Sequence, residues 1–125
     1  MITETTRILL TKLHNDVKSH ALALQKSQLE SEDQLKAITT SISQMETQIA
    51  EIEKDLQTGE LPEYCVKHLE REKRNLGSSL ELKRQHFRIV SESIRDTAEE
   101  VEAIKQQQAE LFNNYVKGDA ENVDD

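Results

Sequence analysis

The amino-acid sequence predicts an all-α protein of two long helices, separated by a break at Gly59–Pro62, that form an elongated coiled coil. Three observations support this fold class. Of the 125 residues, 35% are hydrophobic, 32% are charged and only three are Gly. Apolar residues recur in heptads along both halves of the chain, and the single Pro follows a Gly near the midpoint. High contents of Glu, Lys, Gln and Leu with few glycines are typical of long helices rather than of a globule with a large core.

The charge and the cysteine content limit the class of protein. A net charge of −8 argues against a general affinity for nucleic acid or anionic lipid, because binding to polyanions depends on Lys and Arg. We therefore expect no direct nucleic-acid partner. The single cysteine, Cys65, excludes an intrachain disulfide and favours a reducing, cytoplasmic setting. No stretch approaches the roughly 20 apolar residues that span a bilayer, so we expect membrane association to be peripheral and through partners.

Residues 4–57 are predicted to form the first coiled-coil helix. From Leu35 onward, apolar residues follow one another at alternating spacings of three and four, as the a and d positions of a heptad do. The same rows extend toward the amino terminus. There we expect His14 to be a tolerated polar layer, whereas Gln28 and Ser31 mark either a buried layer that sets register or the point where the helix leaves the bundle. The regular part of the ladder consists of Leu35, Ile38, Ile42, Met45, Ile49, Ile52 and Leu56.

Residues 58–62 are predicted to form a turn or kink. Pro62 lacks an amide hydrogen, and in a continuous helix its ring would clash with the carbonyl of Thr58, at a cost of about 3 kcal/mol. Gly59 after one helix and Pro62 in the first turn of the next follow the usual preferences of these residues. The heptad register also slips by three residues across this segment. Two helices are therefore expected, arranged either as an antiparallel hairpin or as a bent, roughly collinear rod.

Residues 63–116 are predicted to form the second coiled-coil helix, with Gly77 as a weak point that costs about 1 kcal/mol relative to Ala. Residues 117–125 are rich in carboxylates and nearly free of apolar side chains, so we expect a disordered acidic tail. The two heptad rows of the second helix are Val66, Lys73, Leu80, Phe87, Ile94, Val101, Gln108 and Tyr115, and Leu69, Leu76, Lys83, Val90, Thr97, Ile104 and Leu111.

Helices of other chains are expected to complete the core. Two helices that pack only on each other bury one narrow stripe apiece, and Ile in both rows of the first helix favours more than two strands in parallel model coils. The predicted partner-binding residues are Leu35, Ile38, Ile42, Met45, Ile49, Ile52, Leu56, Leu80, Phe87, Val90, Ile94, Val101, Ile104 and Leu111.

The sequence holds no pattern that indicates catalysis or a bound cofactor. There is no glycine-rich phosphate loop and no nucleophile motif, and a two-helix rod offers no concave pocket. Cys65 and His68 are three residues apart, but nothing near them in sequence supplies the further ligands that a metal site needs. We therefore predict a protein that is not an enzyme, with no catalytic, cofactor-binding or metal-binding residues and no cofactor.

A longer pattern in the first helix resembles the snapin family. Residues 18–35, KSHALALQKSQLESEDQL, contain the family's Ser-His at Ser19-His20, its Ser-Gln-aliphatic-Glu at residues 27–30 and its Gln-aliphatic pair at Gln34-Leu35. The likeness extends from about Leu9 to about Val101. The first helix is several residues longer than in the family, and the small-residue-rich extension of some members is missing. Beyond a polar linker, the family's short Leu/Pro/Tyr stretch and following Val-Lys and Leu are similar to Leu61, Pro62, Tyr64, Val66, Lys67 and Leu69.

The resemblance implies a scaffold subunit of biogenesis of lysosome-related organelles complex 1 and of its lysosome-positioning relative, BORC. The implied partners are other small helical subunits of a hetero-oligomeric complex and SNARE proteins. The implied role is in endosome–lysosome and synaptic-vesicle trafficking, in the cytoplasm and peripherally on endosomal, lysosomal or synaptic-vesicle membranes.

Two alternatives compete with this interpretation. Residues 80–87, LELKRQHF, resemble a helix of THO complex subunit 7, which implies a coiled-coil subunit of the nuclear THO complex in mRNA export. The other is a SNARE-like helix with Gln28 as its central polar layer. It is the least favoured because the sequence shows neither an anchor nor a second glutamine-centred ladder.

Overall fold

Two long α-helices make up most of the protein in the computed structural model, which describes residues 2–116. Helix α1 spans Glu4–Gln57, helix α2 spans Glu63–Leu111, and a short π-helix, η1, follows at Phe112–Val116. No strand is present among the described residues. The predicted all-α class, with two long helices and a break at Gly59–Pro62, is therefore confirmed. The acidic tail predicted for residues 117–125 lies outside the described residues.

Helix α1 begins at a threonine cap. The carbonyl of Thr3 accepts the amide hydrogen of Arg7 at 3.0 Å, and Thr3 Oγ1 accepts that of Thr6 at 3.2 Å. The hydroxyl thus satisfies one of the amide groups that the first turn of a helix leaves without a helical partner. Glu4 adds a negative charge at the positive end of the helix dipole.

Helix α1 ends at Gly59, whose φ of 69° lies in the left-handed region that favours glycine. Thr58 closes the last turn. Its amide donates to the carbonyl of Asp55 at 3.3 Å, and its hydroxyl donates to the same carbonyl at 2.8 Å. The amide of Glu60 then donates to Thr58 Oγ1 at 3.3 Å, so the backbone that leaves the helix is tied to it.

Helix α2 begins directly after Pro62. The carbonyl of Pro62 accepts the amide hydrogens of Cys65 at 3.0 Å and of Val66 at 3.1 Å, so it starts the helical ladder. Pro62 therefore occupies the position directly before α2, which begins at Glu63. Its missing amide hydrogen costs nothing there, because that amide would have no helical partner.

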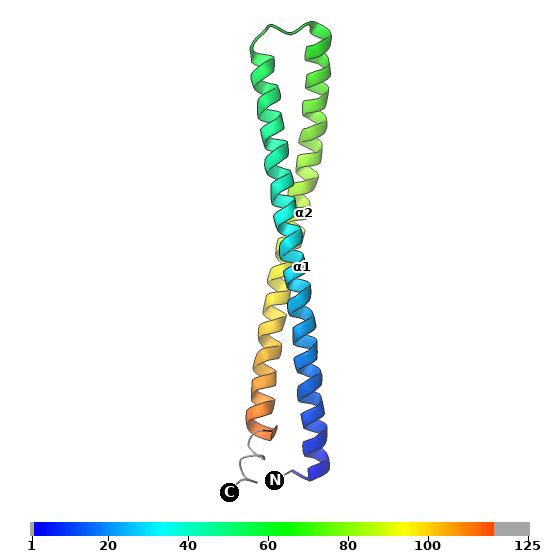
Figure 1. Cartoon of the computed structure of the whole chain (residues 1–125), viewed down its shortest axis with the longest axis vertical. Coiled ribbons are helices and arrows are strands. Elements are labelled where there is room, and N and C mark those ends of the chain that lie inside the picture. Colours follow the sequence, from blue (N-terminus) through cyan, green and yellow to red (C-terminus); the bar gives the residue numbers. More distant parts are fainter. Residues whose placement is uncertain (1, 117–125) are drawn as a thin grey trace. The chain divides into compact units, whose positions relative to one another are not determined.

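The chain divides into two compact units, and each contains a part of both helices. Unit 2, Ser31–Ser93, holds the end of α1, the turn and the start of α2, which lie side by side and run in opposite directions (Figure 1). Three polar contacts join the two helix segments. From one contact to the next, the residue number increases on α2 and decreases on α1, as it does between antiparallel helices. Within unit 2 the chain is an antiparallel hairpin and not a bent rod. The three pairs are Glu53 with Lys73, Glu46 with Arg84 and Gln34 with His86.

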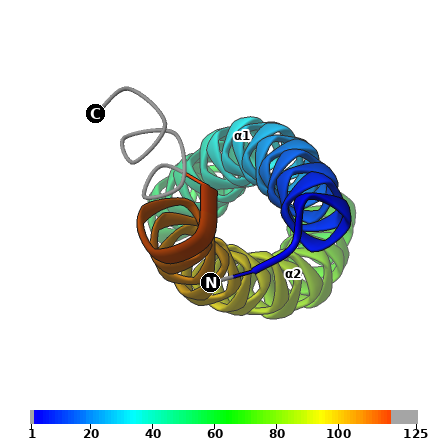
Figure 2. The same cartoon turned by 90° about the horizontal axis from the view of Figure 1, so that it is seen from below.

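Unit 1 combines the start of α1, as far as Glu30, with the end of α2 and η1, from Ile94. Figure 2 shows these segments end-on, with α1 in blue and the end of α2 in orange. The rings of His14 and Phe112 lie against each other across the two segments, with their centroids 5.3 Å apart and their planes tilted by 34°. Contacts of this kind join residues that are nearly 100 positions apart in the sequence.

The core of each unit is formed by residues of the predicted heptad rows. Ala21 and Val101 are buried in unit 1, and Ile38, Leu80 and Val90 are buried in unit 2. The other members of the first ladder, from Leu10 to Leu56, are half-buried. No side chain among the described residues is less than 2% exposed. The heptad positions thus face the neighbouring helix, but the core that they form is thin.

The two described glycines predict opposite effects of the same substitution. Gly59→Ala should lower the free energy of unfolding by about 1 kcal/mol, because alanine adopts a positive φ only with strain. Gly77→Ala should raise it by about 1 kcal/mol, because Gly77 lies within α2 with open space around its Cα. Urea unfolding of the two variants at one protein concentration measures both effects. A Gly59→Ala variant as stable as the parent would contradict the role given to this glycine.

Candidate partner-binding surface

The predicted partner-binding residues lie on the faces through which the two helices of the chain contact each other. In unit 2, Ile38, Leu80 and Val90 are buried. In unit 1, Val101 is buried. That these residues bind a second protein is still a prediction. Phe87 is exposed. The remaining members are half-buried: Leu35, Ile42, Met45, Ile49, Ile52, Leu56, Ile94, Ile104 and Leu111.

Half-burial follows from the number of helices in each unit. A residue at an a or d position meets one neighbouring helix in a two-helix contact, whereas in a larger bundle it is enclosed from both sides. The sides of these residues that point away from the contact therefore stay accessible. Phe87 is an example, because it belongs to a heptad row and is still 37% exposed.

Polar side chains also occupy row positions in unit 2. Lys73 and Lys83 are half-buried, and Lys73 Nζ lies 3.1 Å from Glu53 Oε1. Nearby, Arg84 Nη2 lies 3.4 Å from Glu46 Oε1. These pairs remain about half exposed, so each contributes about 1 kcal/mol at most. Their main effect is to favour one register of the antiparallel pair over its alternatives.

Several large apolar side chains are exposed outside the predicted rows. On α1 in unit 1, Ile8, Leu22 and Leu29 form a line that we term the outer row. On α2 in unit 2, Leu82 and Ile89 are exposed in the same way. These residues were absent from the predicted partner-binding set. Their separations, which are multiples of seven, are visible in the sequence but are obscured by the stronger a and d rows.

A shallow depression lies beside His14 in unit 1. Its volume is about 380 Å³, and its lining is largely apolar. His14 is half-buried, and its Nδ1 atom is buried without a hydrogen-bond partner among the described residues. The residues that line the depression are His14, Lys105, Gln108, Ala109 and Phe112.

The described residues hold no group of three or more His, Cys, Asp or Glu side chains that would suit a metal ion. Cys65 is a half-buried free thiol at the start of α2, and His68 is exposed one turn later. Among residues 2–116, no helix has an apolar stretch long enough to cross a bilayer.

Comparisons of the chain with protein families, with curated proteins and with solved structures gave no match.

His14 provides a test of the packing in unit 1. Replacing it by Leu should raise the free energy of unfolding by about 1 kcal/mol, because the substitution removes a buried nitrogen without a hydrogen-bond partner and leaves an apolar contact with Phe112. Thermal or urea unfolding, followed by circular dichroism, measures the change. The matched control is His20→Leu, since His20 is exposed and its replacement should alter stability by less than about 0.5 kcal/mol. Equal effects of the two substitutions would contradict the packing assigned to His14.

Proposed function

We propose that this protein is a non-enzymatic coiled-coil scaffold subunit that assembles with other small helical chains into a hetero-oligomeric complex. One observation carries the proposal: the heptad rows of both helices are only half-buried when the chain packs on itself. Complete burial of one apolar side chain is favourable by about 1.5–3 kcal/mol of free energy. A partner that covered the half-buried rows would therefore gain a large part of this free energy at each residue.

The shape of the rows favours helices as partners. In unit 2 the members of the first ladder recur at spacings of three and four along α1, as the knobs of a coiled-coil helix do, and all of them except Ile38 are half-buried. Ile42 and Ile49 are β-branched residues in one of these rows, and Ile38 and Ile52 supply the other. Isoleucine in both rows fits a bundle of more than two helices better than an isolated pair.

The cellular role in the proposal rests on the resemblance of residues 18–35 to the snapin family. On that basis the assembly would be biogenesis of lysosome-related organelles complex 1 or BORC, and the role would be in endosome–lysosome and synaptic-vesicle trafficking. SNARE proteins would be additional partners, and α2 would contribute to binding them. Membrane association would be peripheral, through these partners.

Phe87 allows the proposal to be tested with little risk to the fold. Because Phe87 is partly exposed, Phe87→Glu should leave the helical content unchanged but reduce the recovery of co-purifying helical subunits by at least about tenfold. Charge at Ile42 and Ile49 together, or at Phe87 with Ile94, should abolish recovery. The measurement is mass spectrometry after gentle affinity purification from cells, with circular dichroism of each purified variant.

The matched control is Gln85→Glu, which adds the same charge to an exposed polar position of α2. It should leave recovery of the subunits unchanged. Unchanged recovery with Phe87→Glu would contradict the use of this row in assembly. Material bound to chromatin and released by nuclease, instead of material on vesicle or lysosomal membranes, would contradict the trafficking role and favour the THO alternative.

A further inference from the structure

The outer row lies on an exposed side of α1 in unit 1. Ile8, Leu22 and Leu29 are 56%, 57% and 62% exposed, and they follow one another at intervals of 14 and seven residues. Residues separated by multiples of seven share one line along a coiled-coil helix. Asn15 occupies the one intermediate position of this line. The segment therefore has a second apolar row in addition to the row that packs on α2.

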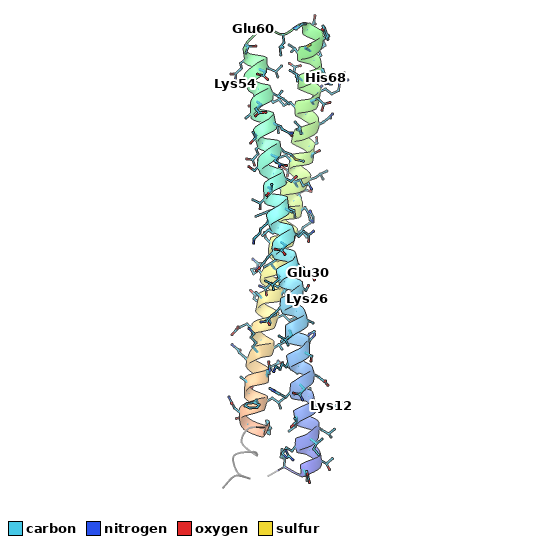
Figure 3. All side chains as sticks on the ribbon, viewed as in Figure 1. Lys12, Lys26, Glu30, Lys54, Glu60 and His68 are labelled. Atoms are coloured by element: carbon cyan, nitrogen blue, oxygen red, sulfur yellow. The ribbon has the colours of Figure 1, made fainter. Side chains whose placement is uncertain are left out.

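Lysines flank the outer row on both sides. Lys12 is four residues after Ile8, and Lys18 and Lys26 are four residues before and after Leu22, so each lysine neighbours the row on the helix surface. All three lysines are exposed, and none forms an ion pair with the described residues. Figure 3 shows Lys12 and Lys26 along the same helix.

Acidic residues are rare at the equivalent positions. Within unit 1 the one carboxylate three or four residues from a member of the row is Glu4, and it lies 3.9 Å from Arg7 Nη2. Beyond Leu29 the flanking positions hold the acidic residues Glu32 and Asp33. Asp16 and Glu30 are also exposed, and they lie further round the helix from the outer row than the lysines do. Between these ends the outer row is therefore flanked by two lysines on one side, Lys12 and Lys26, and by one lysine on the other, Lys18. The whole chain nevertheless carries a net charge of −8.

We propose that this face is a docking site for an amphipathic helix of another subunit, with an apolar heptad row flanked by carboxylates. The inference rests on the proposed function and specifies the chemistry of one partner. The apolar row supplies the contact area, and the lysines select a helix with Glu or Asp at its flanking positions and repel a basic one.

The other possible occupants fit this face less well. A second copy of the chain docked through the same face would bring lysines against lysines, which is unfavourable. An anionic membrane would meet a narrow row interrupted by Asn15 and without any aromatic residue.

The probe for the test is a labelled synthetic four-heptad helix with Leu at a and d and Glu at e and g, titrated with the full chain by fluorescence anisotropy. The same helix with Lys at e and g is the comparison peptide. The Glu peptide should bind at least about tenfold more tightly, and rising salt should reduce its advantage. Leu22→Ser with Leu29→Ser should weaken its binding by at least about tenfold. Lys12→Glu, Lys18→Glu and Lys26→Glu together should reverse the preference between the peptides.

The matched control is Leu82→Ser with Ile89→Ser, which makes the same change at residues that are 66% and 64% exposed on α2. This variant should bind the Glu peptide like the parent. Equal affinity for the two peptides, or equal losses in the two double variants, would overturn the proposal. Binding of the parent, but not of the Leu22/Leu29 variant, to phosphatidylserine vesicles would overturn it in favour of a membrane. A dimer in sedimentation that only the Leu22/Leu29 variant loses would overturn it in favour of a second copy.

The scaffold role can fail independently of this site. If helical subunits co-purify with the parent and with the Leu22/Leu29 variant alike, while the two peptides bind equally, then the docking site is wrong and the scaffold role stands. If no helical subunit co-purifies with the parent, then the scaffold role is wrong whatever the peptides show.

Discussion

When only two helices pack together, each side chain in the contact is covered on one side and open to solvent on the other. This constraint accounts for the partial burial of the heptad rows. Among the described residues, one segment of α1 packs against one segment of α2 in each unit, so the heptad rows are packed on one side and open on the other. The result is a thin core with five buried hydrophobic residues among those described and no side chain below 2% exposure. The fold therefore specifies its own pairing while leaving part of its apolar surface exposed.

Polar groups at the contact set the register of the pair more than its stability. The ion pairs Glu53–Lys73 and Glu46–Arg84 are about half exposed, so water and salt weaken them. A sliding of one helix past the other would nevertheless separate both pairs at once. His14 is a comparable case in unit 1, where a ring contact with Phe112 accompanies a buried nitrogen without a hydrogen bond. Such polar layers reduce stability and restrict the number of alternative pairings.

Charge is distributed so that neighbouring faces of the protein have different chemistry. The α1 segment of unit 1 presents lysines beside the outer row, whereas the α2 segment of the same unit presents a series of carboxylates. In the proposed scaffold role, each face would exclude the partners that belong to another face. The half-buried heptad rows and the outer row would in this way bind different helices without competing for them.

The sequence by itself determined the features that depend on local interactions. Alternating spacings of three and four give the helices and the rows that face inward, and Gly59 and Pro62 separate the two helices because one takes a left-handed backbone and the other lacks an amide hydrogen. Only the tertiary structure decided that unit 2 is a hairpin, that Phe87 stays partly exposed in its row, and that His14 meets Phe112. These outcomes depend on contacts between residues far apart in the chain. A heptad pattern is compatible with several partners and directions, and it does not choose among them.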